Sequence, residues 1–398
     1  MDQKELSASQ ITIMAIAAGI CVANIYYNQP ILKEIASSFN VTEAKVGVIA
    51  VLAQAGYGLG LFFLTPLGDK MNRKKLIIIL QGFLVVALLG MSLISNLYAL
   101  YASSLLIGLF AVSAQVILPM AASLSTTNKG KKVAIVFTGI LVGILVARVF
   151  SGFISGFLGW HYVYAISAVL VVIAAAMIHF SLPDVVPAFK GTYIQLLRST
   201  LIQLKRFAVL RRTALLGAVI FGIFSSFWTT LTFQLSAEPF NYGPEQIGLF
   251  GILAVGGALL APVFGKLADN GNAARAQLVM VILILSGIIL IKLMSNWIGS
   301  YLIAVLFIDI GVQAIQVTNI ATIYGLDQSA NSRINTVYMT TYFLGGAIGT
   351  FAGVQCWRIG GWELVTWQMI AWAVVALILV WMGFKKSRFR LIDPSEKI

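Results

Sequence analysis

Long apolar runs recur along the whole chain and are separated by short polar segments. Each run is close to the ~20 residues that a helix needs to cross about 30 Å of hydrocarbon. Backbone groups in lipid must find partners within the protein, and these runs lack the alternation of polar and apolar residues that barrel strands show. The pattern therefore predicts an all-α membrane protein with twelve transmembrane helices. The predicted spans are 10–30, 46–66, 76–95, 98–124, 133–158, 162–182, 213–235, 245–267, 277–294, 298–324, 334–355 and 363–384.

A longer polar stretch, 183–212, separates the first six runs from the last six. Prolines at its start stop a helix, and the residues that follow have an apolar and a polar face at helical spacing. This pattern predicts an amphipathic helix on the cytoplasmic membrane surface. We expect a linker between two bundles, with a partner-binding or regulatory role as the alternative. The predicted domains are an N-terminal six-helix bundle (1–182), a cytoplasmic amphipathic linker (183–212), and a C-terminal six-helix bundle with a cytoplasmic tail (213–398).

The two halves also share short sequence matches at a nearly constant offset. Gly265–Asp269 follows Thr65–Asp69 by 200 residues, and Gly361-Trp362 follows Gly159-Trp160 by 202 residues. A common offset between halves of equal helix number predicts two six-helix bundles related by an internal repeat. Repeated halves around a site at the membrane midplane are an architecture of alternating access.

The net charge of +13 follows the expected membrane topology. Of the 27 Lys and Arg residues, 22 fall in the loops of one side when the loops are assigned alternately. By the positive-inside rule that side is cytoplasmic, which predicts a multi-pass protein of the cell inner membrane with both termini in the cytoplasm. We therefore expect no nucleic-acid partner. The two cysteines, Cys21 and Cys356, predict neither a disulfide framework nor a metal site.

The short loop after the second span carries the stretch from Asp69 to Lys75. It resembles the loop signature of the major facilitator superfamily, Gly-x-x-x-Asp-Arg/Lys-x-Gly-Arg-Arg/Lys-Arg/Lys. Thr65 and Asn72 stand at its two glycine positions. The resemblance covers essentially the full length of the chain. It implies two bundles that rock about a cavity lined by the first, fourth, seventh and tenth spans.

The fifth span is rich in glycine, at Gly139, Gly143, Gly152 and Gly156. In this it resembles the fifth helix of efflux-type members of the same superfamily. The Gly-Pro pair of those members is absent, and Ser104 stands in the fourth span where they have an arginine. Taken together, the chain is most similar to bacterial small-molecule and drug efflux permeases of the drug:proton antiporter type.

The resemblance also implies that the loop braces the cytoplasmic side in one conformational state. Asp69, Arg73 and Lys74 are the predicted conformational latch. A carboxylate beside a helix N-terminus gains ~0.3–1 kcal/mol, and the expected acceptor is the start of the eleventh span, near 331–335. The alternative is that the loop serves only as a positive-inside anchor.

Two ionisable residues, Arg148 and Asp309, fall near the membrane centre, each ~17 Å from the outer end of its span. Insertion of such a group costs ~2.5–3.5 kcal/mol, so both are candidates for function. Equal depth and opposite charge suggest that they pair across the two bundles; the alternative is that polar neighbours satisfy each one separately. We predict that Asp309 and Arg148 carry proton coupling.

Polar residues of several spans are expected to line the cavity. In the tenth span, Asp309, Gln313 and Gln316 recur at helical spacing along one stripe. Amides and aromatics with few charges suit a neutral or amphipathic organic substrate, although single aromatics are more often packing residues. Gly345, Gly346 and Gly349 are expected to allow close helix contact across the bundle interface. The predicted substrate-binding residues are Asn24, Tyr27, Asn28, Gln115, Trp228, Gln234, Gln313, Gln316 and Tyr338.

An embedded enzyme would need catalytic groups or metal ligands at one depth. The two histidines, His161 and His179, lie near opposite membrane faces, and the sequence has no phosphate-binding loop. We therefore expect a transporter and not an enzyme, with no cofactor and with the proton gradient as its energy source. The expected function is secondary active transport by alternating access, with proton-coupled efflux of a small organic compound by a monomer in the lipid bilayer. Proton-coupled uptake, flipping of a lipid-like amphiphile, and ligand binding by a non-transporting receptor are the alternatives.

Overall fold

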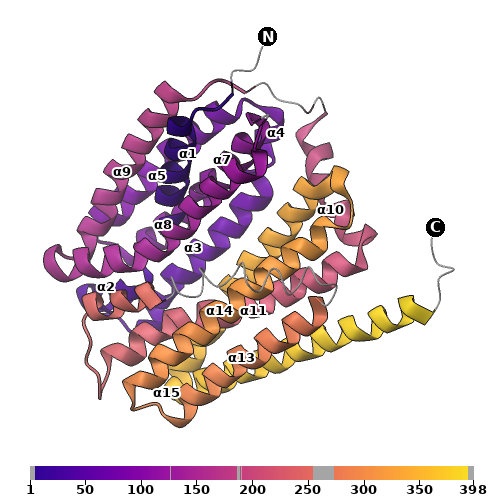
Figure 1. Cartoon of the computed structure of the whole chain (residues 1–398). Helices are drawn as coiled ribbons and strands as arrows, with labels where there is room; N and C mark the ends of the chain where they lie inside the picture. Colours follow the sequence, from indigo (N-terminus) through magenta and orange to yellow (C-terminus); the bar gives the residue numbers. More distant parts are fainter. Residues whose placement is uncertain (1–4, 126, 186–188, 190, 254–272, 393–398) are drawn as a thin grey trace. The chain divides into compact units, whose positions relative to one another are not determined.

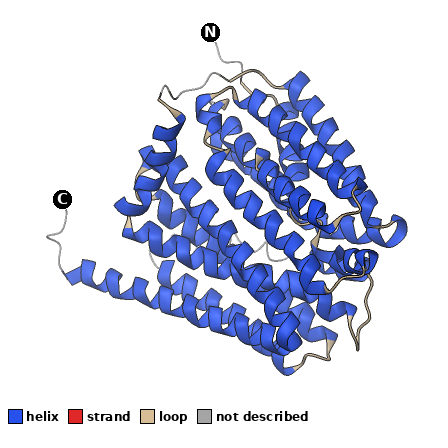
Figure 2. Ribbon diagram, turned by 180° about the vertical axis from the view of Figure 1, so that it is seen from behind, coloured by secondary structure: helices blue, strands red, loops and turns tan. Residues whose placement is uncertain are grey.

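The computed structural model describes residues 5–125, 127–185, 189, 191–253 and 273–392 (Figure 1). Within these ranges the regular elements are all helices (Figure 2). Nine helical segments of the described part are long and apolar enough to cross a membrane, and a shorter apolar helix, α1, precedes them. An all-helical membrane protein is thus confirmed, whereas the count of twelve spans stays a prediction. The eighth predicted span, 245–267, lies mostly outside the described residues, as does the second motif copy at 265–269.

The described chain divides into two compact units. Unit 1 comprises residues 1–202 and 228–252, and unit 2 comprises residues 203–227 and 253–398. These are units of close packing, and the domain boundaries expected from the sequence stay a prediction. The helices of unit 1 are α1 (Ala8–Ala23), α2 (Leu32–Phe39), α3 (Glu43–Phe63), α4 (Leu67–Lys70), α5 (Arg73–Leu93), α6 (Leu97–Ala111), α7 (Ser113–Ser123), α8 (Lys129–Leu158) and α9 (Trp160–Ser181), with a 3-10 turn at Gln29–Ile31.

The first predicted span, 10–30, is not one continuous helix. α1 ends at Ala23, and the chain passes through the 3-10 turn before α2 begins at Leu32. The side-chain amide of Asn24 donates to the carbonyl oxygen of Ile20 at 2.8 Å, and Pro30 has no N–H to donate. Local hydrogen bonds of this kind compete with regular helix, which explains the break at the level of Asn24.

Unit 2 contains the first part of α11 (Ala208–Ser236), α13 (Ala273–Leu293), α14 (Ile298–Tyr324), a 3-10 turn (Gln328–Ala330) and α15 (Asn331–Ile392). α15 holds the last two predicted spans, which are separated by a kink at Gly360 and Gly361. Gly361 has φ +57°, and Gly159, between α8 and α9, has φ +98°. Both values favour glycine. The two glycines of the predicted repeat therefore make the same kind of helix junction.

The glycines of the eleventh predicted span do not pack as expected. A Cβ on Gly345 would lie 2.4 Å from the carbonyl oxygen of Ala218, and one on Gly349 would lie 2.2 Å from that of Gly222. Both neighbours belong to α11 within unit 2, so these glycines serve contact between helices of one unit. The expectation of a contact across the bundle interface was wrong for Gly345 and Gly349. Periodicity in the sequence identified close contact but could not identify the partner helix.

The predicted amphipathic helix of the linker is present as α10 (Tyr193–Arg206). Leu196 and Thr200 are buried on one of its faces, whereas Ile194 is 75% exposed. The backbone N–H of Phe189, just before α10, donates to the carbonyl oxygen of Asp69 at 3.0 Å. The linker is therefore tied to α4, while part of the apolar face of α10 is exposed.

Apolar side chains cover the outer faces of the long helices. In α9 the buried positions Val163, Ser167, Val171 and Ala174 follow one helical stripe, and Phe180 on another face is 85% exposed. A soluble protein rarely exposes large apolar patches of this kind. The exposed apolar faces therefore suit contact with the hydrocarbon of a membrane. The polar side chains that are buried between these helices need a separate explanation.

Candidate functional site

Arg148, in the middle of α8, is the largest fully buried side chain among the described residues, with 1% of its surface exposed. Its Nε donates to Oε1 of Gln29 at 2.8 Å. Its Cζ lies 3.9 Å from the ring centroid of Trp228 and 5.3 Å from that of Tyr26. The guanidinium is thus surrounded by an amide oxygen and two aromatic faces, both of which attract a cation.

The elements around Arg148 hold these partners in place. Gln29 and Tyr26 follow the end of α1, and Trp228 belongs to the part of α11 that lies in unit 1. Thr232, one turn after Trp228, donates its hydroxyl to the backbone oxygen of Gln29 at 2.7 Å. This bond fixes the segment that carries the Gln29 acceptor, so the cation site is built from three separate helices or turns.

Glycines let another helical segment approach α8 beside Arg148. A Cβ on Gly152 would lie 2.4 Å from the carbonyl oxygen of Pro244, and one on Gly248 would lie 2.7 Å from that of Arg148. The segment 244–253 is therefore in backbone contact with α8. This contact fixes the backbone of α8 at the residue whose side chain carries the cation.

Asp309, in α14 of unit 2, is 2% exposed. Gln313 and Gln316 follow it at i+4 and i+7 and are half-buried. The hydroxyl of Tyr342 on α15 lies at hydrogen-bond distance, 3.5 Å, from Oε1 of Gln316. The polar stripe expected in the tenth span therefore faces other parts of the protein at Asp309 and is partly accessible farther along.

Tyr338 belongs to a buried hydrogen-bond chain in the same unit. Nε2 of Gln277 on α13 donates to Oδ1 of Asn319 at 2.8 Å, and Nδ2 of Asn319 donates to the hydroxyl of Tyr338 at 3.2 Å. Tyr338 is fully buried. The chain joins α13, α14 and α15, so Tyr338 holds three helices together in this state.

The predicted substrate residues of the first and fourth spans lie in unit 1. Oδ1 of Asn24 accepts from the hydroxyl of Ser167 at 2.7 Å, and Nδ2 of Asn28 donates to the Ile25 oxygen at 3.3 Å. The ring of Tyr27 lies 5.5 Å from that of Phe150.

Nε2 of Gln115 donates to the hydroxyl of Tyr57 at 3.2 Å. Gln234 is 9% exposed.

The predicted substrate residues therefore fall into two groups, each inside one unit. The unit 1 group is Asn24, Tyr27, Asn28, Gln115, Trp228 and Gln234; the unit 2 group is Gln313, Gln316 and Tyr338.

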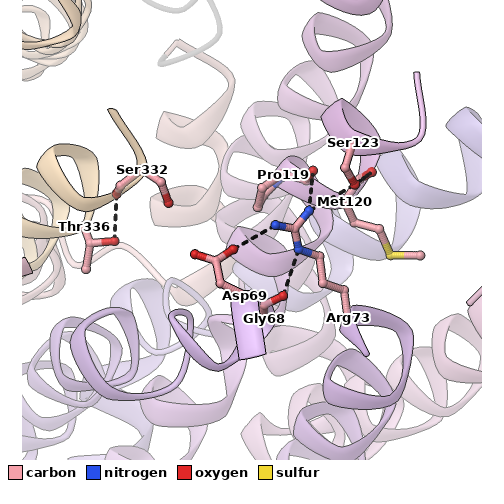
Figure 3. Close-up of polar contacts among 8 residues, drawn as sticks. All are labelled: Gly68, Asp69, Arg73, Pro119, Met120, Ser123, Ser332 and Thr336. Carbon is pink, nitrogen blue, oxygen red and sulfur yellow. Dashed lines mark hydrogen bonds and ion pairs between the residues drawn. The ribbon is translucent and has the colours of Figure 1, made fainter. Parts of the chain in front are cut away.

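Arg73 is the centre of the hydrogen bonds around the predicted latch (Figure 3). Its Nη2 donates to Oδ1 of Asp69 at 2.9 Å and its Nε to the Gly68 oxygen at 3.0 Å. Its Nη1 donates to the Pro119 oxygen and to Oγ of Ser123, both at 3.0 Å. One guanidinium thus fastens α4 to the C-terminal end of α7.

The rest of the loop is held by α5. Oδ1 of Asn72 accepts from the backbone N–H groups of Lys74 and Lys75, and Nζ of Lys74 donates to the Leu182 oxygen at 2.7 Å. Asn72, which stands where the signature has glycine, therefore caps the N-terminus of α5. The expected acceptor of the latch lies in unit 2, where Thr336 donates to the Ser332 oxygen within α15 (Figure 3). The latch itself stays a prediction.

A family model described as the Major Facilitator Superfamily matches residues 14–350 of the chain. The chain belongs to the major facilitator superfamily. The uncharacterized transporter YgaY of Escherichia coli (strain K12) is 36% identical over 384 residues, which cover 96% of this chain and 98% of YgaY. The probable transporter SCO4007 of Streptomyces coelicolor is 27% identical and aligns with 85% of this chain and 79% of its own length.

A bacterial homologue of the human lysosomal transporter Spinster, solved in an inward-facing and unoccupied conformation, has the same fold. Its TM-score is 0.75 at 14% sequence identity, with 95% of this chain and 96% of that chain covered. This likeness shows the fold alone. Members of the superfamily are transporters and not enzymes, so the chain is a membrane transporter.

Sequence reasoning gave less weight to several residues that the structure places at these sites. Gln29 and Tyr26, near the end of the first predicted span, are not among the predicted site residues, yet both contact Arg148. Gln277 was not singled out, although it begins the hydrogen-bond chain to Tyr338. An uncharged amide inside an apolar run was the available signal in both cases.

Proposed function

We propose that this superfamily member is a secondary active transporter that expels a small neutral or amphipathic organic compound by alternating access, in exchange for protons. The observation that carries the proposal is the burial of one ionisable side chain inside a membrane span of each unit. Arg148 is 1% exposed in α8, and Asp309 is 2% exposed in α14. Such groups cost several kcal/mol in a membrane and are found where a function requires them.

In this proposal Asp309 binds the transported proton. A carboxylate is the group that can exchange a proton at physiological pH once its surroundings shift its affinity, whereas a guanidinium stays charged. Arg148 is the fixed positive charge of the other unit, held by Gln29, Tyr26 and Trp228. The pairing of the two charges expected from the sequence stays a prediction.

Amides and aromatic rings form the proposed substrate site. Asn24, Tyr27 and Trp228 in unit 1 and Gln313, Gln316 and Tyr338 in unit 2 supply hydrogen-bond donors, acceptors and apolar faces with little charge. These groups suit a neutral or amphipathic compound better than a polyanion, which needs several cations. The proton gradient is the proposed energy source, and Asp69, Arg73 and Lys74 the proposed latch.

The proposed setting is the cell inner membrane, with a monomer whose termini both lie in the cytoplasm. The distribution of Lys and Arg supports this orientation, because 22 of 27 fall on one side of the predicted topology. Reaction of surface cysteines placed in alternate loops with an impermeant maleimide, in intact cells, tests it.

The experiment for the proposed function has two stages. A thermal-shift screen of the purified chain over drugs, sugars, amino acids and lipids selects a ligand. Proteoliposomes then measure ligand flux driven by a pH gradient and, separately, ligand exchange at equal pH. We expect Asp309→Asn to lose the pH-driven flux and to keep exchange, while Asp327→Asn behaves like the wild type. Asp327 is a suitable control because it pairs with Arg206 at 2.6 Å outside the predicted spans.

Two results would contradict the proposal. One is full pH-driven flux by Asp309→Asn, which would remove this carboxylate from the coupling. The other is ligand accumulation in the same direction as proton flow, which would indicate uptake by symport.

A further inference from the structure

A groove of about 430 Å³ runs between α1 and α8 in unit 1, with Leu170 of α9 beside it. Sixteen residues line it, and only Thr12, Thr138 and Tyr27 among them carry a polar side-chain atom. The hydroxyl of Thr138 already donates to the carbonyl oxygen of Ala134 at 2.9 Å. The walls therefore suit a hydrocarbon ligand.

The shape of the groove follows from how the two helices touch. Gly19 of α1 and Gly143 of α8 are in backbone contact, since a Cβ on Gly143 would lie 2.3 Å from the Gly19 oxygen. Larger aliphatic residues stand to the side of this contact and are about half exposed, with Ile16 at 47% and Val142 at 50%. Small residues thus form the floor, and branched residues form the rims.

The dimensions suit one chain. The lining extends from Thr12 on α1 to Tyr27 just after that helix, and from Ile135 to Phe150 on α8, which corresponds to ~22 Å along α8. A volume of about 430 Å³ over this length leaves room for an extended hydrocarbon chain. The hydrocarbon of one bilayer leaflet is ~15 Å deep, so the groove can accommodate a chain along that whole depth.

The cytoplasmic end of the groove carries positive charge. Lys131 lies one turn before Ile135, on the same helical stripe as Ile135, Thr138 and Val142, and it is exposed. It is in the first turn of α8, whose free N–H groups add to the positive potential. Lys132, by contrast, is engaged with Glu5 at 2.7 Å. Lys131 is therefore placed to meet an anion at the level of the lipid headgroups.

We propose that the α1–α8 groove binds one acyl chain of an anionic phospholipid of the cytoplasmic leaflet, whose phosphate contacts Lys131. The anionic lipids of that leaflet supply the matching charge. Burial in the groove gives the chain little hydrophobic gain over bulk lipid, because both surroundings are apolar. Packing selects the site, and charge selects the headgroup. The lipid is a resident ligand of unit 1 and not the transported compound, so this proposal goes beyond the proposed function.

The test uses the full chain in nanodiscs that contain a phosphatidylglycerol probe with a photoreactive diazirine on one acyl chain. After irradiation, mass spectrometry maps the labelled peptides. We expect labelling of α1 and α8 at the lining residues, several-fold stronger than with a phosphatidylcholine probe of the same chains. Equal labelling of all outward-facing helices, or equal labelling by both probes, would overturn the proposal.

Two matched pairs of variants sharpen the test. Val142→Trp fills the groove from its rim and should reduce labelling of α1 and α8 several-fold, whereas Val172→Trp should not. Val172 is a fair control because it is 52% exposed on α9 and does not line the groove. Lys131→Gln should reduce the preference for phosphatidylglycerol, and Lys75→Gln, at an exposed lysine in the first turn of α5, should leave it unchanged.

Melting temperatures of all four variants check that they are folded, so a loss of labelling reports on the groove. Unchanged labelling in folded Val142→Trp would overturn the proposal. Dodecyl phosphate distinguishes the other source of a single chain: if it displaces the lipid and is itself carried into proteoliposomes, the groove belongs to the substrate path and the proposal is wrong. Displacement without transport would support a resident lipid.

Discussion

The α1–α8 pair of unit 1 and the α11–α15 pair of unit 2 make the same helix contact with different chemistry beside it. In both units an Ala-x-x-x-Gly segment meets a Gly-x-x-x-Gly segment at backbone distance, a motif that suits close helix packing in membranes. The contacts are Ala15–Gly139 and Gly19–Gly143 in unit 1, and Ala218–Gly345 and Gly222–Gly349 in unit 2. Five residues beyond the last glycine, unit 1 has Arg148 and unit 2 has Val354, both 1% exposed.

In terms of the predicted repeat, the difference separates a feature that both halves share from one that they do not. The backbone contact needs only small residues, and it occurs in both halves. The buried charge at the next turn occurs in one half only, so packing does not require it. Asp309 has no charged counterpart in the first half either, because the 200-residue offset between the halves places Leu109 at the matching position. We infer that the two charges serve transport, whereas the glycines serve architecture.

The largest effect is expected from Gly143→Ala and Gly349→Ala. Each new Cβ would lie within 2.3 Å of a backbone oxygen, against Gly19 in one case and Gly222 in the other. Separation of the helices should cost ~2 kcal/mol or more in either unit, measured as a lower melting temperature. Gly82→Ala, in open space on α5, is the control and should be neutral or stabilising. A lower melting temperature for only one of the two substitutions would contradict the comparison between the two helix pairs.

Arg148→Met should abolish coupled transport while costing roughly 1–3 kcal/mol of stability, the usual penalty for a buried acceptor that has lost its donor. It leaves Oε1 of Gln29 without the donor at 2.8 Å. Val354→Met, at the matching turn of unit 2, should leave transport nearly unchanged. Flux and melting temperature are measured together, and full transport by Arg148→Met would remove this charge from the mechanism.

A double-mutant cycle extends that prediction. If Arg148 and Asp309 are energetically coupled, Arg148→Met with Asp309→Asn should destabilise the chain by less than the two single changes add up to, with a difference of ~0.5–3 kcal/mol. Additive melting-temperature changes would mean that the charges act separately.

Glu34 in α2 should make stability depend on pH. Burial, together with the nearby charge of Glu245, raises the pKa of its carboxyl from 4.5 to about 7, against the opposing effects of a backbone hydrogen bond and of Lys33. Ionisation therefore costs folding free energy, so stability should fall as the pH rises from 4.5 through about 7, by up to ~3 kcal/mol. Glu34→Gln should remove this dependence. A pH profile of melting unaltered by the substitution would contradict the assignment.

The smallest effect concerns Glu5 before α1. Hydrogen bonds to Lys132 and Thr127 lower the pKa of its carboxyl to about 2. The contact of Glu5 with Lys132 and Thr127 should thus stabilise the protein above the ordinary pKa of 4.5. This stabilisation should be lost as the pH falls toward 2. Because the groups are exposed, only local change is expected. Glu5→Gln should speed hydrogen exchange of the Thr127 amide, which donates to Glu5 at 2.9 Å, and leave distant amides unchanged. Equal exchange at Thr127 would show that the contact is not held in solution.

The sequence predicted the helices and the membership in the superfamily well, because both predictions depend on local patterns. Apolar runs located the nine long apolar helical segments of the described residues, and Gly159 and Gly361 both form helix junctions with positive φ. The partners of buried side chains depend on tertiary packing, which no local pattern contains. Arg148 was identified as a buried charge, but its contacts with Gln29 and Trp228 come from segments about 120 residues before it and 80 after it. The same limit explains why Gly349 was assigned to the wrong kind of contact.

Proton release on ligand binding tests the central claim, that Asp309 is the proton carrier of a secondary transporter. The purified chain in weakly buffered detergent, with a pH indicator, is mixed with the ligand selected by the thermal-shift screen. Linkage requires that a ligand competing with a proton releases it on binding. The wild type and Asp327→Asn should release protons, whereas Asp309→Asn should bind the ligand and release none. Undiminished release by Asp309→Asn would place the coupling proton on another group.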